Sequence, residues 1–391
     1  MINSTAFIRN QIEKNGSFKY SPQNEISNLY SSCFGILSLN LINELENFEN
    51  KEITIKFINK HQDKNTGYFI DQSCIPNTHA SHDSEYIYLQ LTDFAQLALS
   101  SLNACPNYKY KFLKRYKNIK YLKKWFYGLN WKNPWYVSNI IMFVLNCFIY
   151  ENRQDNQKYI NFIMELLQES QDKNTGFWNL NQGASLHNQM AGAYHFIIFY
   201  TFLGIQPNYI KKIIDSTLLI QEYDGLFNYQ TGGGSCDDLD AIDLLCRATF
   251  YTNYRKNEIE RALRKSYLAL LKNQNKDGGF CWAKRDRDLL KLGTSLLHFK
   301  TLKNIGFSEF KIHTYAKLKQ LAIICFHKLD YWRYSGLDSM KIKTIDSDLF
   351  STWFRLNAIA LIETTFPKIC NNEQSFQWNM RKKSGLGFYK I

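Results

Sequence analysis

Gln62-Asp-Lys-Asn-Thr-Gly-Tyr-Phe69 and Gln171-Asp-Lys-Asn-Thr-Gly-Phe-Trp178 are two copies of one eight-residue phrase. Weaker copies occupy residues 221–227 and 274–282, and looser ones residues 11–18, 125–128, 334–337 and 384–388. The glycines of these copies, at positions 16, 67, 128, 176, 225, 278, 336 and 387, are 48 to 61 residues apart. A phrase that recurs at such an interval predicts a fold built from repeated structural units.

The phrase has the composition of a turn that follows a helix. Each copy comes after an apolar-periodic segment, such as residues 159–167 or 262–271, and its Gly stands where a helix C-cap needs a positive φ. The neighbouring Asp or Asn can close the turn through its own side chain. We expect the aromatic residue to pin the turn onto the helices and the Gln to bond the backbone of a neighbouring repeat.

A second, more apolar segment follows each turn. Seven such segments cover residues 29–45, 85–102, 137–150, 190–203, 241–251, 289–302 and 349–362. They are apolar nearly all round, which is typical of buried helices, whereas the segments between them are amphipathic and rich in Lys. The pattern predicts an all-α protein in which six to seven helical hairpins close into a ring, with the apolar helices inside, as a single domain over residues 1–391.

The phrase resembles a known repeat. Gln-x-x-x-x-Gly-x-Trp/Phe at this interval is similar to the QW-type repeat of squalene–hopene and oxidosqualene cyclases, and to the related repeat of protein prenyltransferase β subunits. The resemblance implies an α/α toroid for nearly the whole chain. Because α/α toroids also serve polysaccharide lyases, glycosidases and non-catalytic thioester domains, the chemistry has to be inferred from the site.

Composition narrows the class of protein further. The 391 residues are 45% hydrophobic and 21% charged, which excludes a disordered chain. Only 6 prolines favour long helices, and nine cysteines without a CxxC pair make a disulfide framework or zinc ribbon unexpected. The N-terminus has no apolar signal core, and the apolar runs are too short to span a bilayer. We therefore expect a soluble cytoplasmic protein.

The net charge of +13 suits an anionic partner, and contact with a membrane surface is compatible with it. We predict a small-molecule or oligosaccharide substrate and no nucleic acid. P-loop, GxSxG, HExxH and dinucleotide-binding motifs are absent from the sequence.

The loops before the apolar segments carry most of the candidate site residues. In a ring of parallel inner helices, the N-terminal ends meet at one mouth, and the loops there are unusually polar. We predict that the following residues bind substrate: His79, His82, Asp83, Trp135, Tyr136, His187, Asn188, Asp243 and Asp348.

The most informative loop is Thr231-Gly-Gly-Gly-Ser-Cys-Asp-Asp-Leu-Asp-Ala-Ile-Asp243, in which four carboxylates follow three glycines. A helix N-terminus lowers the pKa of a carboxyl group, whereas crowding several anions raises the pKa of one of them. A group with a raised pKa can act as a general acid. A purely structural helix cap would need only one or two carboxylates.

Asp238-Leu-Asp240-Ala resembles the Asp-x-Asp-Asp motif of class II terpene cyclases, in which the middle Asp protonates an alkene or epoxide. The resemblance implies that Asp240 is the acid and Asp238 its flanking residue, and we include Asp237 among the catalytic candidates. The last Asp of that motif is replaced by Ala241 here.

Protein prenyltransferases offer another comparison, because they hold zinc with an Asp, a Cys and a His. Asp277, Cys281 and His298 have these types but not the spacing, so we predict no metal and no cofactor. The favoured function is a cyclase- or prenyltransferase-like enzyme that uses a carboxylate acid on a prenyl or polycyclic-lipid substrate. Two alternatives remain: a carbohydrate-active toroid, favoured by an open polar groove, and a non-catalytic binding toroid, favoured by a shallow mouth.

Overall fold

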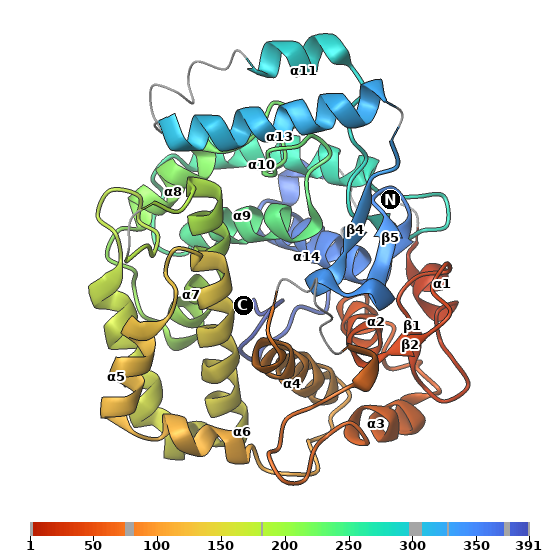
Figure 1. The fold of residues 1–391 in the computed structure, drawn as a ribbon, viewed down its shortest axis with the longest axis vertical. Coiled ribbons are helices and arrows are strands. Elements are labelled where there is room, and N and C mark those ends of the chain that lie inside the picture. The colour runs from red at the N-terminus through yellow and green to blue at the C-terminus, as the bar shows by residue number, and fades with distance from the viewer. Residues whose placement is uncertain are drawn as a thin grey trace.

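Six helices stand in a closed ring at the centre of the computed structural model (Figure 1). The structure describes residues 3–74, 82–180, 183–296, 307–326, 328–370 and 376–389. In this part of the chain the ring consists of α2 (Leu29–Leu41), α4 (Ser84–Ser101), the first half of α6 (Pro134–Ser170), α7 (Leu186–Leu203), α9 (Ser235–Ala248) and α14 (Leu349–Thr365). Each packs against the next, and α14 packs back against α2. The predicted all-α toroid is confirmed.

A second layer of helices surrounds the ring. It contains α1 (Thr5–Arg9), α3 (Lys51–Asn59), α5 (Ile119–Gly128), the second half of α6, α8 (Ile210–Leu219) and α10 (Lys256–Lys272). These helices are amphipathic: α10, for example, buries Ile259, Leu263 and Leu270 and exposes its charged side chains. Inner α7, by contrast, is buried over nearly its whole length. The predicted alternation of buried and solvated helices is confirmed.

The inner and outer helices of one hairpin are continuous in α6. At Asn152 the backbone leaves helical geometry (φ −168°, ψ 102°), and this kink reverses the chain from the ring to the outer layer. The two separate segments that the sequence predicts, residues 137–150 and 159–167, lie on either side of this kink.

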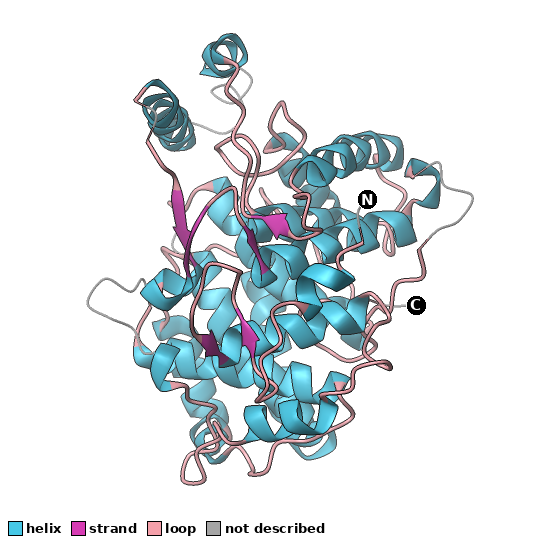
Figure 2. Cartoon of the chain, turned by 90° about the vertical axis from the view of Figure 1, so that its right-hand side faces the viewer, coloured by secondary structure: helices cyan, strands magenta, loops and turns pink. Residues whose placement is uncertain are grey.

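Extended segments (Figure 2) and 3₁₀ segments are short. The strands form three antiparallel pairs: β1 (Phe18–Lys19) with β2 (Ser27–Asn28), β3 (Phe280–Cys281) with β6 (Ser347–Asp348), and β4 (Tyr331–Arg333) with β5 (Lys341–Lys343), the last in the register Trp332 to Ile342. The 3₁₀ turns are η1 (Gln72–Cys74), η2 (Lys111–Tyr116), η3 (Tyr334–Gly336), η4 (Asp338–Met340) and η5 (Pro367–Ile369). Within the described residues no pair exceeds three residues per strand.

The repeated phrase forms the expected turn and also joins neighbouring repeats. Gly67 and Gly176 have φ values of +85° and +78°. Gln62 Nε2 donates to the carbonyl oxygens of Gly67 (3.1 Å) and Tyr108 (2.7 Å). The Tyr108 N–H donates back to Gln62 Oε1 (2.7 Å). Gln171 repeats this pattern with Gly176 and Asn208, so the predicted role of the Gln is confirmed.

Three of the looser copies have other roles. Gly128 is the last residue of the helix α5. Gly336 lies between strands β4 and β5 and lines the central cavity. Residues 384–388 belong to a C-terminal segment that crosses the base of the ring. These copies lack the Gln and the Asp of the full phrase. Their aromatic residue and Gly alone were not enough to tell them from a true repeat turn.

The prediction of an inner helix over residues 289–302 is wrong. Its described part, α11 (Leu289–Leu296), packs on α13 (Phe307–Cys325) outside the ring, and the Leu290 side chain is 83% exposed (Figure 1). The neighbouring inner helices α9 and α14 pack directly on each other, so the ring has no gap for a seventh helix. An apolar run predicts that a helix packs in apolar surroundings, but it does not show whether these surroundings lie inside the ring or outside it.

The C-terminal segment, residues 376–389, closes the end of the ring at which the inner helices stop. The Asn379 N–H donates to the Leu41 carbonyl at the end of α2 (2.9 Å). Arg381 Nη1 donates to the Leu97 carbonyl near the end of α4 (2.9 Å). The first of these bonds satisfies a carbonyl group that the end of α2 leaves unpaired, and the second anchors the segment to α4. Leu386 of this segment lines the cavity inside the ring.

Candidate functional site

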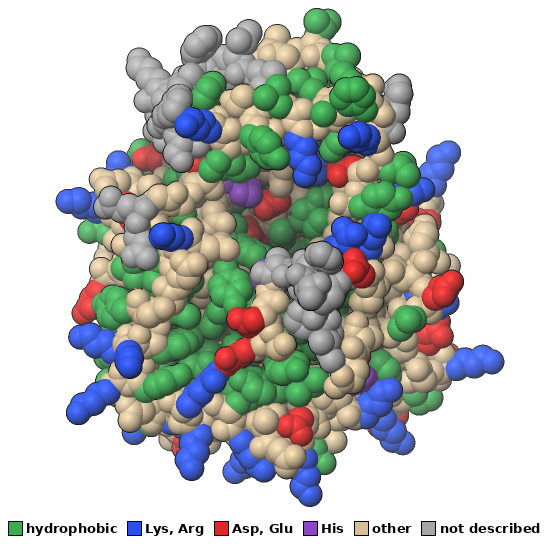
Figure 3. All heavy atoms as spheres, viewed as in Figure 1, with side chains coloured by type: hydrophobic (Ala, Val, Ile, Leu, Met, Phe, Trp, Pro, Cys, Tyr) green, Lys and Arg blue, Asp and Glu red, His purple; other side chains and the backbone are tan. Residues whose placement is uncertain are grey.

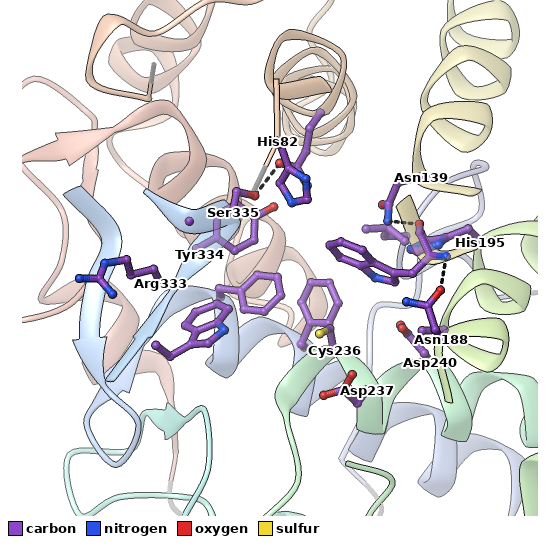
Figure 4. Close-up of a pocket in the computed structure, with 18 of the residues that line it drawn as sticks. His82, Asn139, Asn188, His195, Cys236, Asp237, Asp240, Arg333, Tyr334 and Ser335 are labelled. Carbon is purple, nitrogen blue, oxygen red and sulfur yellow. Dashed lines mark hydrogen bonds between the residues drawn. The ribbon is translucent and has the colours of Figure 1, made fainter. Parts of the chain in front are cut away.

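A cavity of about 390 Å³ lies inside the ring and opens among the N-terminal ends of the inner helices. Figure 3 shows the hollow in the face of the molecule, and Figure 4 shows the side chains that line it. The described lining comes mainly from α4, α6, α7, α9, α14 and the β4–β5 hairpin, with Trp282 after β3 and Leu386 of the C-terminal segment. The predicted meeting of helix N-termini at one mouth is therefore confirmed, with the hairpin as an unpredicted sixth contributor.

One wall of the cavity is aromatic. Its side chains are Phe94, Trp282, Trp332, Tyr334, Phe350 and Phe354, whereas Trp135 lies beside His82 and Asn188 on the other side. The rings of Trp282 and Trp332 stack with centroids 4.2 Å apart, and Phe350 lies 4.8 Å from Tyr334. Such a wall presents negative π faces, which attract a cation, as well as apolar area for a hydrocarbon.

The opposite wall is polar. It contains His82, Asn133, Asn139, His187, Asn188, His195, Asp237 and Asp240. Burial lowers the pKa of His195 to about 3 and that of His82 to about 4. Both rings are therefore neutral at pH 7. His195 Nδ1 lies 2.8 Å from Ser138 Oγ, and the His82 ring stacks on Tyr86 at 4.1 Å.

Asp240 is the buried acid of this wall. It lies on the second turn of α9, is 1% exposed and lines the cavity, and its Oδ2 has no hydrogen-bond partner among the described residues. Burial raises the pKa of Asp240 well above its ordinary value, and the nearby Asp237, Asp243 and Asp238 raise it further. Burial and the neighbouring acids thus favour the protonated form of this carboxyl group, and its Oδ2 faces no described partner that would compete with a bound molecule.

Asp237 lies closer to the mouth, one helical turn before Asp240. Its Oδ2 accepts a hydrogen bond from Asn228 Nδ2 (2.6 Å), and its Oδ1 lies 3.4 Å from His187 Nε2. The His187 ring packs against Tyr229 with centroids 4.7 Å apart. Asp237 and His187 thus form a polar pair between the buried acid and the outside.

The other two acids of the cluster do not line the cavity. Asp238 accepts from Arg355 Nη1 (3.1 Å) and from the Phe227 N–H (2.9 Å) inside the wall of the ring. Asp243 forms a fully buried ion pair with Arg247, four residues later. Each of these two carboxyl groups compensates the charge of a buried guanidinium group, which is a structural role. Of the four acids of α9, two therefore line the cavity and two lie within the wall of the ring.

Three further predicted residues form or support the N-caps of helices and do not line the cavity. Asp83 caps α4 by accepting from the Tyr86 N–H (2.8 Å), and the Tyr136 hydroxyl donates to its second oxygen (3.2 Å). Asp348 caps α14 in the same way, through the Ser351 N–H (2.7 Å). None of Asp83, Tyr136 and Asp348 lines the cavity.

Four of the predicted substrate-binding residues do reach it. These are His82, Trp135, His187 and Asn188. Asn188 Oδ1 accepts from the Trp135 N–H (3.1 Å), which ties α7 to α6 at the mouth. His79 lies outside the described residues.

Sequence reasoning missed the lining residues in the middle of the inner helices and in the hairpin. Gln90, Asn139 and His195 interrupt otherwise apolar helices, and a polar side chain there was the available signal. Gln90 Oε1 accepts from the Ser335 hydroxyl of the hairpin (2.9 Å). Nothing in the sequence indicates that residues 332–336 return to the ring, because this contact spans 245 residues.

The zinc comparison finds no support in the geometry. Asp277 Oδ1 accepts from the Gly279 N–H (2.9 Å), the Cys281 thiol donates to the Asn273 carbonyl (3.3 Å), and His298 lies outside the described residues. Across the described ranges, no group of three or more His, Cys, Asp or Glu side chains is arranged to hold a metal ion. In the same residues no helix is both long and apolar enough to span a membrane.

Comparison with known proteins agrees with this architecture. The family model described as prenyltransferase alpha-alpha toroid domain matches residues 3–152 and 107–288. Type II terpene cyclase MstE from Scytonema, in complex with geranylgeranyl dihydroxybenzoate, is 11% identical with a TM-score of 0.51, and the match covers 93% of this chain and 96% of that one. Its complex with merosterolic acid A gives a TM-score of 0.44 at 11% identity, over 94% of this chain and 95% of that one.

The match to ent-copalyl diphosphate synthase from Streptomyces platensis has a TM-score of 0.38 at 13% identity, over 74% of this chain and 50% of that one. No curated protein matches the sequence. At these identities the structural likeness concerns the fold, while the family model covers well over half of the chain. The chain therefore belongs to the prenyltransferase alpha-alpha toroid domain family.

Proposed function

We propose that this protein is a class II terpene cyclase-like enzyme, in which Asp240 protonates an alkene of a prenyl or polycyclic-lipid substrate held in the aromatic cavity. The observation that carries the proposal is a buried carboxyl group with a raised pKa, whose Oδ2 has no partner among the described residues, in a cavity whose opposite wall is aromatic. The likeness of the fold to that of a terpene cyclase with a bound geranylgeranyl compound is consistent with it.

The chemical step needs only the groups of the chain and water. The O–H bond of Asp240 breaks, and the π electrons of the alkene form the new C–H bond, which leaves a carbocation on the substrate and a carboxylate on Asp240. Attack of a second alkene of the same substrate on the cation closes a ring. Transfer of a proton from a carbon next to the final cation to water, together with reprotonation of Asp240 from solvent, completes an isomerisation in which no atom is gained or lost overall.

The two walls suit the two charges that this step creates. The carbocation is stabilised by ring faces such as those of Trp332 and Phe350. Neutral His82 and His195 do not repel the cation, as imidazolium groups would. Asp237 and His187, at the mouth, supply a route by which Asp240 regains its proton from solvent.

The shape of the cavity favours a lipid over an oligosaccharide. A glycan-cleaving toroid would use an open groove, whereas here the C-terminal segment seals one end and a single apolar residue of it, Leu386, forms part of the floor. The polar wall alone would serve a sugar, but the aromatic wall and the closed end serve a folded hydrocarbon chain better.

The test is Asp240→Asn, assayed on a panel of prenyl alcohols, prenyl diphosphates and prenylated aromatic acids. We expect turnover to fall by about 100-fold or more, because the amide cannot donate an acidic proton. The melting temperature should stay the same or rise, because Asn is neutral like the protonated Asp that it replaces. Normal turnover by Asp240→Asn would contradict the proposal, as would a thermal shift produced by oligosaccharides and by none of the prenyl compounds.

A further inference from the structure

Helix α13 presents its polar side to the protein. The side chains that face the ring are Glu309, His313, Lys317 and Gln320, all buried. His313 Nε2 lies 2.7 Å and Lys317 Nζ 2.8 Å from the two carboxylate oxygens of Glu222. Glu309 Oε2 accepts from the Leu186 N–H (2.8 Å) at the start of α7. These contacts fix the rotation of the helix about its axis.

The opposite side of α13 is exposed and carries large apolar side chains together with Lys311 and Lys319. Ile312, Tyr315 and Leu318 point away from the ring, and Tyr315 is 71% exposed. An ordinary surface helix buries its apolar side and exposes its polar side, so α13 is oriented the other way round. The orientation is not a consequence of weak contacts, because the buried side is held by charged hydrogen bonds. Exposed apolar side chains gathered in this way are typical of an interaction surface.

The neighbouring segments extend this surface. Among the described residues 21 large apolar side chains are exposed, and nine of them fall between residues 284 and 345. Leu290 on α11, and Phe326 and Leu329 after α13, are the most prominent besides Tyr315. Figure 3 shows apolar side chains gathered at this end of the molecule with Lys and Arg side chains around them.

The same segment carries most of the net charge of the protein. Residues 283–345 contain thirteen Lys and Arg against five Asp and Glu, a net charge of +8 out of +13. A second cavity, of about 350 Å³, lies between the end of α13 and the β4–β5 hairpin, and five cations line it: Lys284, Arg285, Arg287, Lys328 and Lys343. In the described part of the chain, Arg287, Lys328 and Lys343 have no acidic partner. This cavity is suited to an anionic headgroup.

The surface adjoins the mouth of the central cavity. Leu329 lines the cationic cavity, and three residues later Trp332 lines the central one. Figure 1 shows α11 and α13 at one end of the molecule, on the same side as strands β4 and β5.

We propose that helices α11 and α13 and the cations beside them dock the protein on an anionic lipid bilayer. The apolar side of α13 with Leu290, Phe326 and Leu329 enters the boundary of the acyl chains, and Arg287, Lys328 and Lys343 contact lipid phosphates. A nucleic acid would satisfy the charges but not the apolar side, and a second copy of this chain would place like charges together. The purpose of docking, access to a membrane-borne lipid substrate, rests on the proposed function; the docking itself does not.

Sedimentation with vesicles tests the docking. We expect the protein to bind vesicles of phosphatidylcholine mixed with phosphatidylglycerol, to bind phosphatidylcholine vesicles much more weakly, and to be released by salt. The triple variant Arg287→Glu, Lys328→Glu and Lys343→Glu should lower the partition coefficient by about 100-fold or more, since each cation near the surface contributes roughly 1 kcal/mol.

A matched control is Lys120→Glu, Lys123→Glu and Lys124→Glu on α5, which changes the net charge equally at exposed positions on the outer layer. It should reduce binding several-fold less than the first triple variant. A further variant, Leu290→Ser, Phe326→Ser and Leu329→Ser, should also abolish binding although it keeps every charge.

Four results would overturn the docking: no binding to anionic vesicles, equal losses in the two charge variants, full binding by the serine variant, or binding to duplex DNA that the serine substitutions leave unchanged. A concentration-dependent dimer that the serine variant abolishes would assign the surface to self-association instead. Turnover on detergent-dispersed substrate should be unchanged in all docking variants. Vesicle binding therefore tests the docking alone, whereas turnover tests the proposed chemistry alone.

Discussion

Asp238 of α9 and Arg355 of α14 form an ion pair inside the wall of the ring, with Oδ2 and Nη1 3.1 Å apart and neither side chain exposed to solvent. Arg355 also donates to the carbonyl oxygens of Cys281 (3.0 Å) and Gly232 (3.3 Å). Burial raises the pKa of Asp238 to about 7, although Arg355 acts in the opposite direction. The pair therefore fixes the glycine loop from which α9 starts, and with it the direction of Asp240.

Asp238→Asn should destabilise the fold by about 3 kcal/mol, because it leaves Arg355 buried without a compensating charge. Chemical unfolding with urea measures this change. The control is Asp237→Asn, at a partly exposed position of the same turn, which should change the free energy of unfolding by less than about 1 kcal/mol. A smaller effect at Asp238 than at Asp237 would mean that the ion pair does not hold the loop.

Gly176→Ala should cost about 1 kcal/mol or more of stability, because an added Cβ is strained at a φ of +78° and would lie 2.5 Å from the Ile213 nitrogen. Gly128→Ala is the matched control: it has helical backbone and no heavy atom within 4 Å of the added Cβ, so the substitution should be neutral or slightly stabilising. Thermal melts of the two variants test the assignment of Gly176, and not Gly128, as a true repeat turn.

Asp93→Asn should remove a pH dependence of stability. Gln96 Nε2 (2.8 Å) and Asn146 Nδ2 (3.0 Å) donate to Asp93 Oδ1, and burial raises the pKa of this carboxyl to about 7. Because the folded-state pKa is raised, the contribution of Asp93 to stability is complete below about pH 4 and is lost as the pH rises through 7.

We therefore expect the wild-type free energy of unfolding to fall relative to that of Asp93→Asn between pH 5 and 7, by up to about 1.4 kcal/mol per pH unit. Urea titrations at several pH values give both curves. The neighbouring cation Arg381 opposes the shift, so a constant difference between the two proteins over this range would show that Asp93 is already ionised in the fold.

Leu386→Ala should deepen the central cavity at its base. Leu386 is buried in the C-terminal segment and lines the cavity floor, and the segment is anchored by the Tyr150 hydroxyl, which donates to the Ser384 carbonyl (3.2 Å). The variant should bind longer prenyl chains better relative to shorter ones, by about tenfold for one extra isoprene unit. Leu386→Phe should shift the preference the other way. Thermal shifts with a series of prenyl alcohols measure both, and an unchanged order of preference would assign the floor to other residues.

The sequence by itself determined the toroid. A repeated turn phrase, a positive-φ glycine in it and an all-round apolar helix after it are local properties, and each repeat contacts mainly the next one, so local periodicity is enough to predict the ring. The position of the acid cluster followed in the same way, because Cys236, Asp237 and Asp240 lie at the start of an inner helix and inner-helix starts meet at the mouth.

Only the tertiary structure decided which acids face the cavity. Asp238 and Asp240 are two residues apart on one helix, and their different surroundings come from Arg355, 117 residues away from Asp238, and from a cavity wall built by five other elements. The direction of the apolar side of α13 was decided in the same way, by Glu222 and the start of α7, which hold its polar side. Sequence patterns record which side chains share a face, whereas the partner of that face depends on contacts between distant segments, which local spacing does not encode.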